Sequence, residues 1–228
     1  FNTKAKQLIV SDAGQVIGVR AQTRDGIKDY VARAVVIAAG GYSANREMLE
    51  GAHPGGANIL VRGRSWMTGD GLQMAREIGA GVRGVAGVES LHLPVVCVSD
   101  KGQGSPTRAL PYCVGINQEG QRFVDESLGY ASFGKATLKQ TRQTVALVFD
   151  DTMLKNEKRI GMSVELFQKI GSGLHEAETV AELAQKIQVP AANLEATLKT
   201  YNAAVTGDGK ALAAVPEKKS LASPIGKD

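Results

Sequence analysis

Two glycines, Gly40 and Gly41, close the apolar run Ala-Val-Val-Ile-Ala-Ala at residues 34–39. The run follows charged Arg33 and predicts a strand covered on both faces, as in the sheet of an α/β protein. Ligands of such sheets bind at the carboxyl ends of strands, and glycine lets a backbone or a flat ligand approach closely. The pair therefore predicts a ligand-binding edge, with a tight packing turn as the alternative.

A second candidate is Thr-Gly-Asp-Gly at residues 68–71, which precedes a stretch with apolar residues at helical spacing. A helix start presents free N–H groups to a polar ligand, and the Asp70 carboxylate can accept from hydroxyl or N–H groups. Simple helix capping is the alternative for Asp70. The same tetrapeptide recurs at residues 206–209, but it follows a predicted helix, where Gly207 is an expected C-cap. Only the first copy is a site candidate.

The first third of the chain predicts the elements that position these residues. Strands are expected at residues 6–10, 16–22 and 27–31, joined by glycine-containing turns into an antiparallel meander before the apolar run. Ser43 is expected to cap a short helix that ends at Gly51. Residues 53–65 predict a loop.

The pattern changes after about residue 88. Short apolar runs at residues 93–98, 113–117, 122–124 and 145–149 predict a second sheet. Thr179 and Glu182 fit a capping box, and Pro190 begins a helix with Leu194, Leu198 and Tyr201 on one face, which predicts core packing. Residues 210–228 predict an extended crossing segment.

Composition excludes several classes of function. A hydrophobic fraction of 43% in 228 residues predicts a folded globular chain. The net charge of +4 is spread out, so nucleic-acid binding is not expected. Cys97 and Cys113 lie far apart without histidines at ligand spacing, which argues against a metal site or a disulfide. No apolar run is long enough to span a membrane, and no signal-peptide pattern occurs.

The chain opens at Phe1 and moves almost at once into a strand pattern. We therefore expect an internal segment of a longer protein, with a processed mature chain as the alternative.

The order of several motifs resembles the FAD-dependent fumarate reductase and succinate dehydrogenase flavoprotein family, which includes the 3-ketosteroid dehydrogenases. These motifs are the meander, the run ending in Gly40-Gly41-Tyr42, Thr-Gly-Asp-Gly before a helix, Asn-Gln-Glu-Gly-Gln-Arg-Phe at residues 117–123, and the helical close from Thr179 to Tyr201. The resemblance covers nearly the whole chain.

The resemblance implies a fold of mixed class, α/β followed by α+β. Residues 1–87 would be part of a Rossmann-like FAD-binding domain with its β-meander, and residues 88–228 an α+β capping domain over the substrate. The Gly-x-Gly-x-x-Gly turn that holds the FAD pyrophosphate in this family is absent from the sequence. We therefore expect this chain alone to bind FAD weakly or not at all.

The same resemblance implies site residues. Ala38, Ala39, Gly40 and Gly41 would lie against the FAD, and Asp70 with Gly71 would help to hold it.

The catalytic positions are also carried over from the family. Tyr130 stands where fumarate reductases have an arginine proton donor and where ketosteroid dehydrogenases have a tyrosine proton acceptor; a packed ring with a satisfied hydroxyl is the alternative. A phenol acts as a base near neutral pH only if its pKa is lowered, a role that Arg108 would fill. His92 lies close to the family's substrate-binding histidine. Arg122 is expected to be structural, tying its loop to Asp125 or Glu126.

The implied activity is a flavin-dependent oxidoreductase that reduces or introduces a C=C bond next to a carbonyl or carboxylate, by hydride transfer to or from flavin N5. The expected partners are a small dicarboxylate or enone substrate and an unidentified electron-transfer protein. The expected compartment is the cytoplasm, with the periplasm as the alternative. A non-catalytic ligand-binding or regulatory module on the same scaffold is the alternative function.

Overall fold

The computed structural model describes residues 2–61, 63–84, 95–171 and 173–226. The chain divides into two compact units, residues 1–91 and 92–228, which are described separately below. The boundary expected at residue 87 falls among residues 85–94, outside the described residues.

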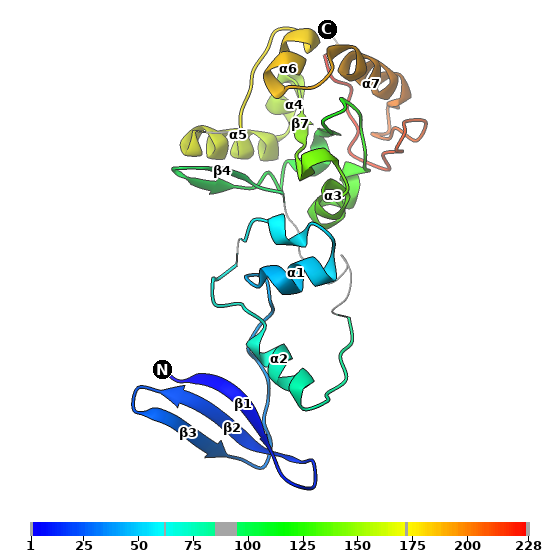
Figure 1. The fold of residues 1–228 in the computed structure, drawn as a ribbon. Coiled ribbons are helices and arrows are strands. Elements are labelled where there is room, and N and C mark those ends of the chain that lie inside the picture. The colour runs from blue at the N-terminus through cyan, green and yellow to red at the C-terminus, as the bar shows by residue number, and fades with distance from the viewer. Residues whose placement is uncertain (1, 62, 85–94, 172, 227–228) are drawn as a thin grey trace. The chain divides into compact units, whose positions relative to one another are not determined.

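The first unit begins with the predicted meander, drawn in blue in Figure 1. Its three strands pair antiparallel in the order β1-β2-β3. Leu8 pairs with Val19 and Ala21 pairs with Lys28, and the side chains of Leu8 and Ala21 are buried. The strands are β1 (Lys4–Val10), β2 (Val16–Thr23) and β3 (Gly26–Val31). The structure therefore confirms the meander that the alternating sequence pattern predicted.

The prediction of a buried strand at residues 34–41 is wrong. These residues lie in no strand, and Val36 is 87% exposed. A strand covered on both faces needs hydrogen-bonded neighbours, and within the described part of the chain β1, β2 and β3 pair only with one another. The apolar run has the composition of a strand but lacks a partner strand among the described residues.

Two α-helices follow in the first unit, α1 (Arg46–Ala52) and α2 (Asp70–Glu77), with a 3₁₀ turn η1 (Gly56–Asn58) inside the predicted loop. The cap of α1 is Asn45 and not Ser43, since the Asn45 side chain accepts from the Met48 N–H at 3.0 Å. The amide of Asn45 also donates to the Thr68 carbonyl at 2.9 Å, so this residue ties the start of α1 to the turn before α2. Helix α2 confirms the second predicted helix.

The second unit contains two small antiparallel sheets, β4-β5 and β6-β7. Val114 pairs with Val148 and Ile116 with Ala146, so the predicted strands at residues 113–117 and 145–149 are confirmed as one sheet. All of β6 is buried. The strands are β4 (Cys97–Ser99), β5 (Gly102–Gly104), β6 (Val114–Ile116) and β7 (Ala146–Val148).

The described residues of this unit also form five α-helices (Figure 1). Residues Leu194, Leu198 and Tyr201 of the last helix are buried in the main core, as predicted. The Thr179 side chain accepts from the Glu182 N–H at 3.1 Å and caps the start of α6, the helix before α7. The predicted helix start at Thr179 is therefore confirmed. The helices are α3 (Tyr130–Thr137), α4 (Asp151–Asn156), α5 (Lys158–Ile170), α6 (Val180–Ile187) and α7 (Ala191–Ala204), with 3₁₀ turns η3 (Leu110–Tyr112), η4 (Glu126–Leu128) and η5 (Thr141–Gln143).

After α7 the chain crosses this unit without a further helix among the described residues. Ala211 and Lys218 form an isolated antiparallel bridge, and Ala211, Ala214 and Ala222 enter the main core. The predicted crossing segment is therefore confirmed over residues 210–226. In the described part of the chain, every helix falls short of the length and apolar character that crossing a membrane requires.

Candidate functional site

The predicted cofactor residues of the first unit come together from two segments. A Cβ placed on Gly71, at the start of α2, would lie 2.7 Å from the Ile37 side chain and 2.9 Å from that of Ala39. Only a glycine therefore allows the start of α2 to pack this closely on residues 37–39. The end of the apolar run and the first turn of α2 form one site candidate.

The two glycines at the end of the run differ in their surroundings. Gly40 has φ +76°, and a Cβ there would lie 2.7 Å from Sδ of Met67, so the packing of the chain itself explains this glycine. A Cβ on Gly41 would meet no atom within 4 Å. The space next to the Gly41 backbone is therefore open.

This arrangement fits a flat cofactor in part. Ala38, Ala39, Gly40 and Gly41 are all exposed, with no side chain longer than a methyl group. A planar ring can lie against such a surface at van der Waals distance, and Gly41 leaves that approach open. The fit rests on Gly41 and the two alanines and not on Gly40, whose missing side chain Met67 replaces.

Asp70 is the first residue of α2, and the N-cap position is occupied by Gly69. One oxygen accepts from the Thr68 hydroxyl at 2.6 Å, and the other pairs with Lys4 Nζ of β1 at 2.9 Å. The Thr68 hydrogen bond and the Lys4 ammonium lower the pKa of Asp70 below its usual range. Asp70 is thus a charged acceptor at the start of α2, and the simple capping role is not observed.

Tyr130 lies in the second unit, as the first residue of α3. Its half-buried ring packs against a small apolar cluster of Leu110, Val124 and Phe133. Gly129 precedes it with φ +83°, and the Gly129 carbonyl accepts from the Phe133 N–H at 3.1 Å. The position of Tyr130 therefore depends on the turn that leads into α3.

Arg108 is exposed in the turn before η3. Leu110, two residues later, belongs to the same apolar cluster that Tyr130 contacts, so the structure brings the two predicted catalytic segments into one neighbourhood. His92 lies outside the described residues.

A buried ionic cluster surrounds the expected Arg122 contact, and its lysine, Lys218, was missed by the sequence reasoning. Arg122 and Glu126 form a two-point ion pair, and Lys218 Nζ lies 3.7 Å from the same carboxylate. The three side chains are 2%, 0% and 0% exposed, respectively. Both cations lie over the ring of buried Tyr201, at 5.0 Å for Arg122 and 6.0 Å for Lys218.

Part of this cluster has a sequence signal. The structural role expected for Arg122 is confirmed, because its guanidinium ties the loop to Glu126 and also donates to the Pro216 carbonyl at 2.6 Å. Lys218 lies almost a hundred residues away from Arg122 and Glu126 in the sequence, and no local pattern distinguishes it from the neighbouring lysine.

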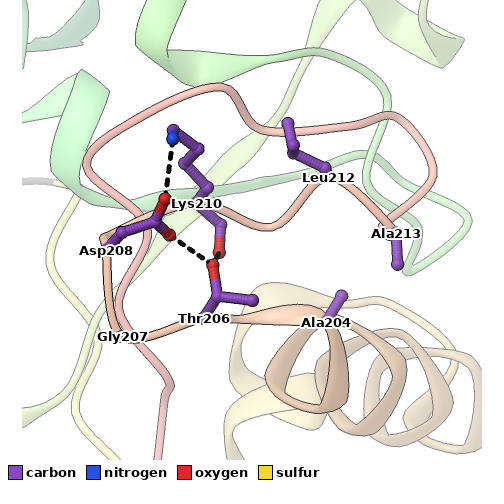
Figure 2. A pocket seen from close by; sticks show the side chains of 7 residues that line it. All are labelled: Ala204, Thr206, Gly207, Asp208, Lys210, Leu212 and Ala213. Carbon is purple, nitrogen blue, oxygen red and sulfur yellow. Dashed lines mark hydrogen bonds and ion pairs between the residues drawn. The ribbon is translucent and has the colours of Figure 1, made fainter.

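The second Thr-Gly-Asp-Gly copy lines a shallow depression of about 550 Å³ after α7 (Figure 2). Its polar side chains pair with one another: Thr206 Oγ1 donates to Asp208 at 2.5 Å, and Lys210 Nζ pairs with Asp208 at 2.6 Å. The C-cap of α7 is Val205 and not Gly207, which corrects the prediction, and the left-handed turn residue is Gly209 with φ +75°.

Comparison with known proteins supports the flavoprotein interpretation. The chain is 30% identical over 203 residues to the probable fumarate reductase Ifc3 of Shewanella frigidimarina, covering 89% of this chain and 33% of that protein. It is 32% identical over 220 residues to 4-oxocyclohexanecarboxylate 2-dehydrogenase of Sinomonas cyclohexanicum, covering 86% and 36%. The chain spans about a third of the length of these curated relatives.

A solved structure shows the same architecture. The 3-ketosteroid Δ1-dehydrogenase of Sterolibacterium denitrificans, in complex with 1,4-androstadiene-3,17-dione, matches with a TM-score of 0.69 at 26% identity, over 89% of this chain and 39% of that one. A family model described as "FAD binding domain" matches residues 1–223. The chain belongs to this family of FAD-binding domains, and FAD is the cofactor of the family.

Proposed function

We propose that this chain is the central part of an FAD-dependent oxidoreductase that reduces or introduces a C=C bond next to a carbonyl or carboxylate. The family match over residues 1–223 is the observation that carries the proposal. The relatives add the reaction class, since their names describe a fumarate reductase, an acrylate oxidoreductase, a urocanate reductase and a cyclohexanone-type dehydrogenase. Each of these names implies chemistry at a carbon–carbon bond next to an electron-withdrawing group.

In this proposal the two parts of the chain have separate roles. Residues 1–87 contribute to the FAD-binding domain, in which Ala38, Ala39, Gly40 and Gly41 lie against the cofactor. Asp70, with Gly71 at the start of α2, accepts hydrogen bonds from it. Residues 88–228 form the capping domain that covers the substrate.

The cofactor supplies hydride transfer at flavin N5 when it is bound. The chain's own residues would handle the proton: the Tyr130 hydroxyl, at the first turn of α3, is the proposed proton carrier. Arg108 is the proposed neighbouring positive charge in this step. His92 is the proposed substrate-binding residue. The electron-transfer partner, a cytoplasmic location and weak FAD binding by this chain alone stay predictions.

The test is to produce the whole flavoprotein that contains this chain and look for a bound yellow cofactor. Its flavin would be reduced and then reoxidised with fumarate-type dicarboxylates or with cyclic enones, and the reverse reaction tested with the saturated compounds. We expect one of the two substrate classes to change the flavin absorbance. A protein that carries FAD and responds to neither class contradicts the proposed reaction.

A pair of tyrosine variants tests the proton carrier. Tyr130→Phe should lower turnover at least about 100-fold, within the range expected for loss of a general acid or base. Tyr112→Phe is the matched control: this half-buried tyrosine accepts a hydrogen bond from Arg159 at 2.6 Å and packs against the main core. Equal turnover in the two variants would remove Tyr130 from the mechanism.

A further inference from the structure

Three contacts join the C-terminal segment at residues 216–219 to residue Cys113, before β6, and to Arg122 and Asp125, which precede α3. Arg122 donates to the Pro216 carbonyl at 2.6 Å, and Lys218 Nζ donates to the Cys113 carbonyl at 2.9 Å. The Lys219 backbone N–H donates to the Asp125 carboxylate at 3.3 Å. Segments about 100 residues apart in the sequence are therefore fixed to one another by polar contacts inside this unit.

The turn held in this way determines where α3 begins. Glu126 is the first residue of η4, and its carboxylate accepts from the Gly115 N–H of β6 at 2.8 Å as well as from Arg122. Its carbonyl accepts from the Gly129 N–H at 3.1 Å, and Gly129 directly precedes Tyr130. A shift of the Glu126 carboxylate would therefore move the residues that lead into Tyr130.

The contacts of Lys218 point to positioning. The buried cluster is balanced in charge, since Arg122 and Lys218 lie near two buried carboxylates, those of Glu126 and Asp125. The fully buried Lys218 ammonium donates to the Cys113 carbonyl, directly before β6, and lies 3.7 Å from the carboxylate of Glu126 at the start of η4. Lys218 therefore joins two segments that are both distant from it in the sequence.

We propose that Lys218 is a positioning residue for Tyr130: it fixes the Glu126 turn against β6 and so sets where the Tyr130 hydroxyl lies. This inference rests on the role given to Tyr130 under the proposed function. Lys218 itself does not touch the reacting atoms in this proposal.

The experiment uses the whole flavoprotein and expresses turnover per bound flavin. Lys218→Gln keeps an amide donor for the Cys113 carbonyl and leaves the Arg122–Glu126 pair in place, and circular dichroism checks that the variant is folded. Lys218→Met is the second variant, which removes the donor as well. Lys219→Gln is the matched control, since the Lys219 side chain is 60% exposed and pairs only with Glu217. Each change is made in the wild-type protein and in Tyr130→Phe.

We expect Lys218→Gln to lower kcat about 10- to 100-fold with little change in KM, as for a small misplacement of a reacting group. The same change in Tyr130→Phe should produce no further loss, because Lys218 acts only through Tyr130. Lys219→Gln should leave kcat unchanged, both in the wild-type protein and in Tyr130→Phe.

The outcomes separate the two proposals. Wild-type turnover in both Lys218 variants, or an equal loss in both backgrounds, overturns the positioning role and leaves the proposed function standing. Wild-type turnover in Tyr130→Phe overturns the proposed role of Tyr130, and this inference with it.

Discussion

The Arg122 guanidinium and the Glu126 carboxylate meet at two points inside the second unit, Nε to Oε1 at 3.0 Å and Nη2 to Oε2 at 2.8 Å. Both side chains are almost fully buried. Removing one member of such a pair leaves an uncompensated charge, which is more harmful than replacing both members.

The first prediction follows from this pair. Glu126→Gln should lower the free energy of unfolding of the chain by about 3–5 kcal/mol. Urea unfolding followed by circular dichroism measures the change. Glu217→Gln is the control, because Glu217 is exposed and pairs with exposed Lys219. Equal midpoints for the two variants would show that the buried pair does not stabilise the fold.

The second prediction concerns the core around α7. Leu198 is 4% exposed in the main cluster, so Leu198→Ala should cost about 2–5 kcal/mol of unfolding free energy through lost burial and the cavity left behind. Leu212→Ala is the same change at a residue that is 56% exposed, and it should alter the free energy by less than about 0.5 kcal/mol. A Leu198→Ala protein as stable as Leu212→Ala would contradict the position of α7 in the core.

The third prediction uses the two cysteines. Burial raises the pKa of the Cys113 thiol to about 12, and the residue is 1% exposed. At pH 8 only about one thiol in ten thousand would be ionised at that pKa, and the thiolate is the reactive form. A thiol reagent should therefore modify half-buried Cys97 in the folded chain and reach Cys113 only after denaturation. Rapid labelling of a folded Cys97→Ser variant would disprove this assignment.

The fourth prediction concerns the groups that lower the pKa of Asp70. Thr68→Val and Lys4→Met should each raise that pKa, since the Thr68 hydroxyl donates to the carboxylate and Lys4 contributes both a hydrogen bond and its charge. Carboxyl NMR titration of the chain measures both shifts. Because the folded pKa is the lower one, the stability linked to Asp70 is present above its unfolded pKa and is lost as the pH falls through the folded pKa. An Asp70 pKa that stays unchanged in both variants would contradict the contacts at the start of α2.

Local patterns predicted the local structure of this chain well. The meander, the cap at Thr179 and the apolar face of α7 depend on residues a few positions apart, and all three are confirmed. The apolar run at residues 34–41 is the contrary case. Its composition is that of a strand, but a strand also needs a hydrogen-bonded partner, which composition does not reveal.

Tertiary contacts decided the features that sequence reasoning missed. Asn45 caps α1 in place of Ser43 while it also binds the Thr68 carbonyl, 23 residues away. Met67 fills the space beside Gly40, so one of the two glycines that predicted a ligand edge has a packing explanation. Lys218 reaches Cys113 across 105 residues. None of these pairings has a spacing that a periodic pattern could reveal.

The difference between the two glycines gives the last prediction. Gly41→Leu places a side chain into open space, so the unfolding free energy of the chain should change little. In the whole flavoprotein the same side chain would occupy the surface proposed for the cofactor, and FAD content after purification should fall at least about tenfold. Gly40→Ala, in contrast, should lower the unfolding free energy of this chain by about 1–2 kcal/mol, because the φ of Gly40 is +76° and an added Cβ would lie too close to the Met67 sulfur. A Gly41→Leu flavoprotein with a full complement of FAD would show that the cofactor does not lie against this backbone, whatever the stability of the variant.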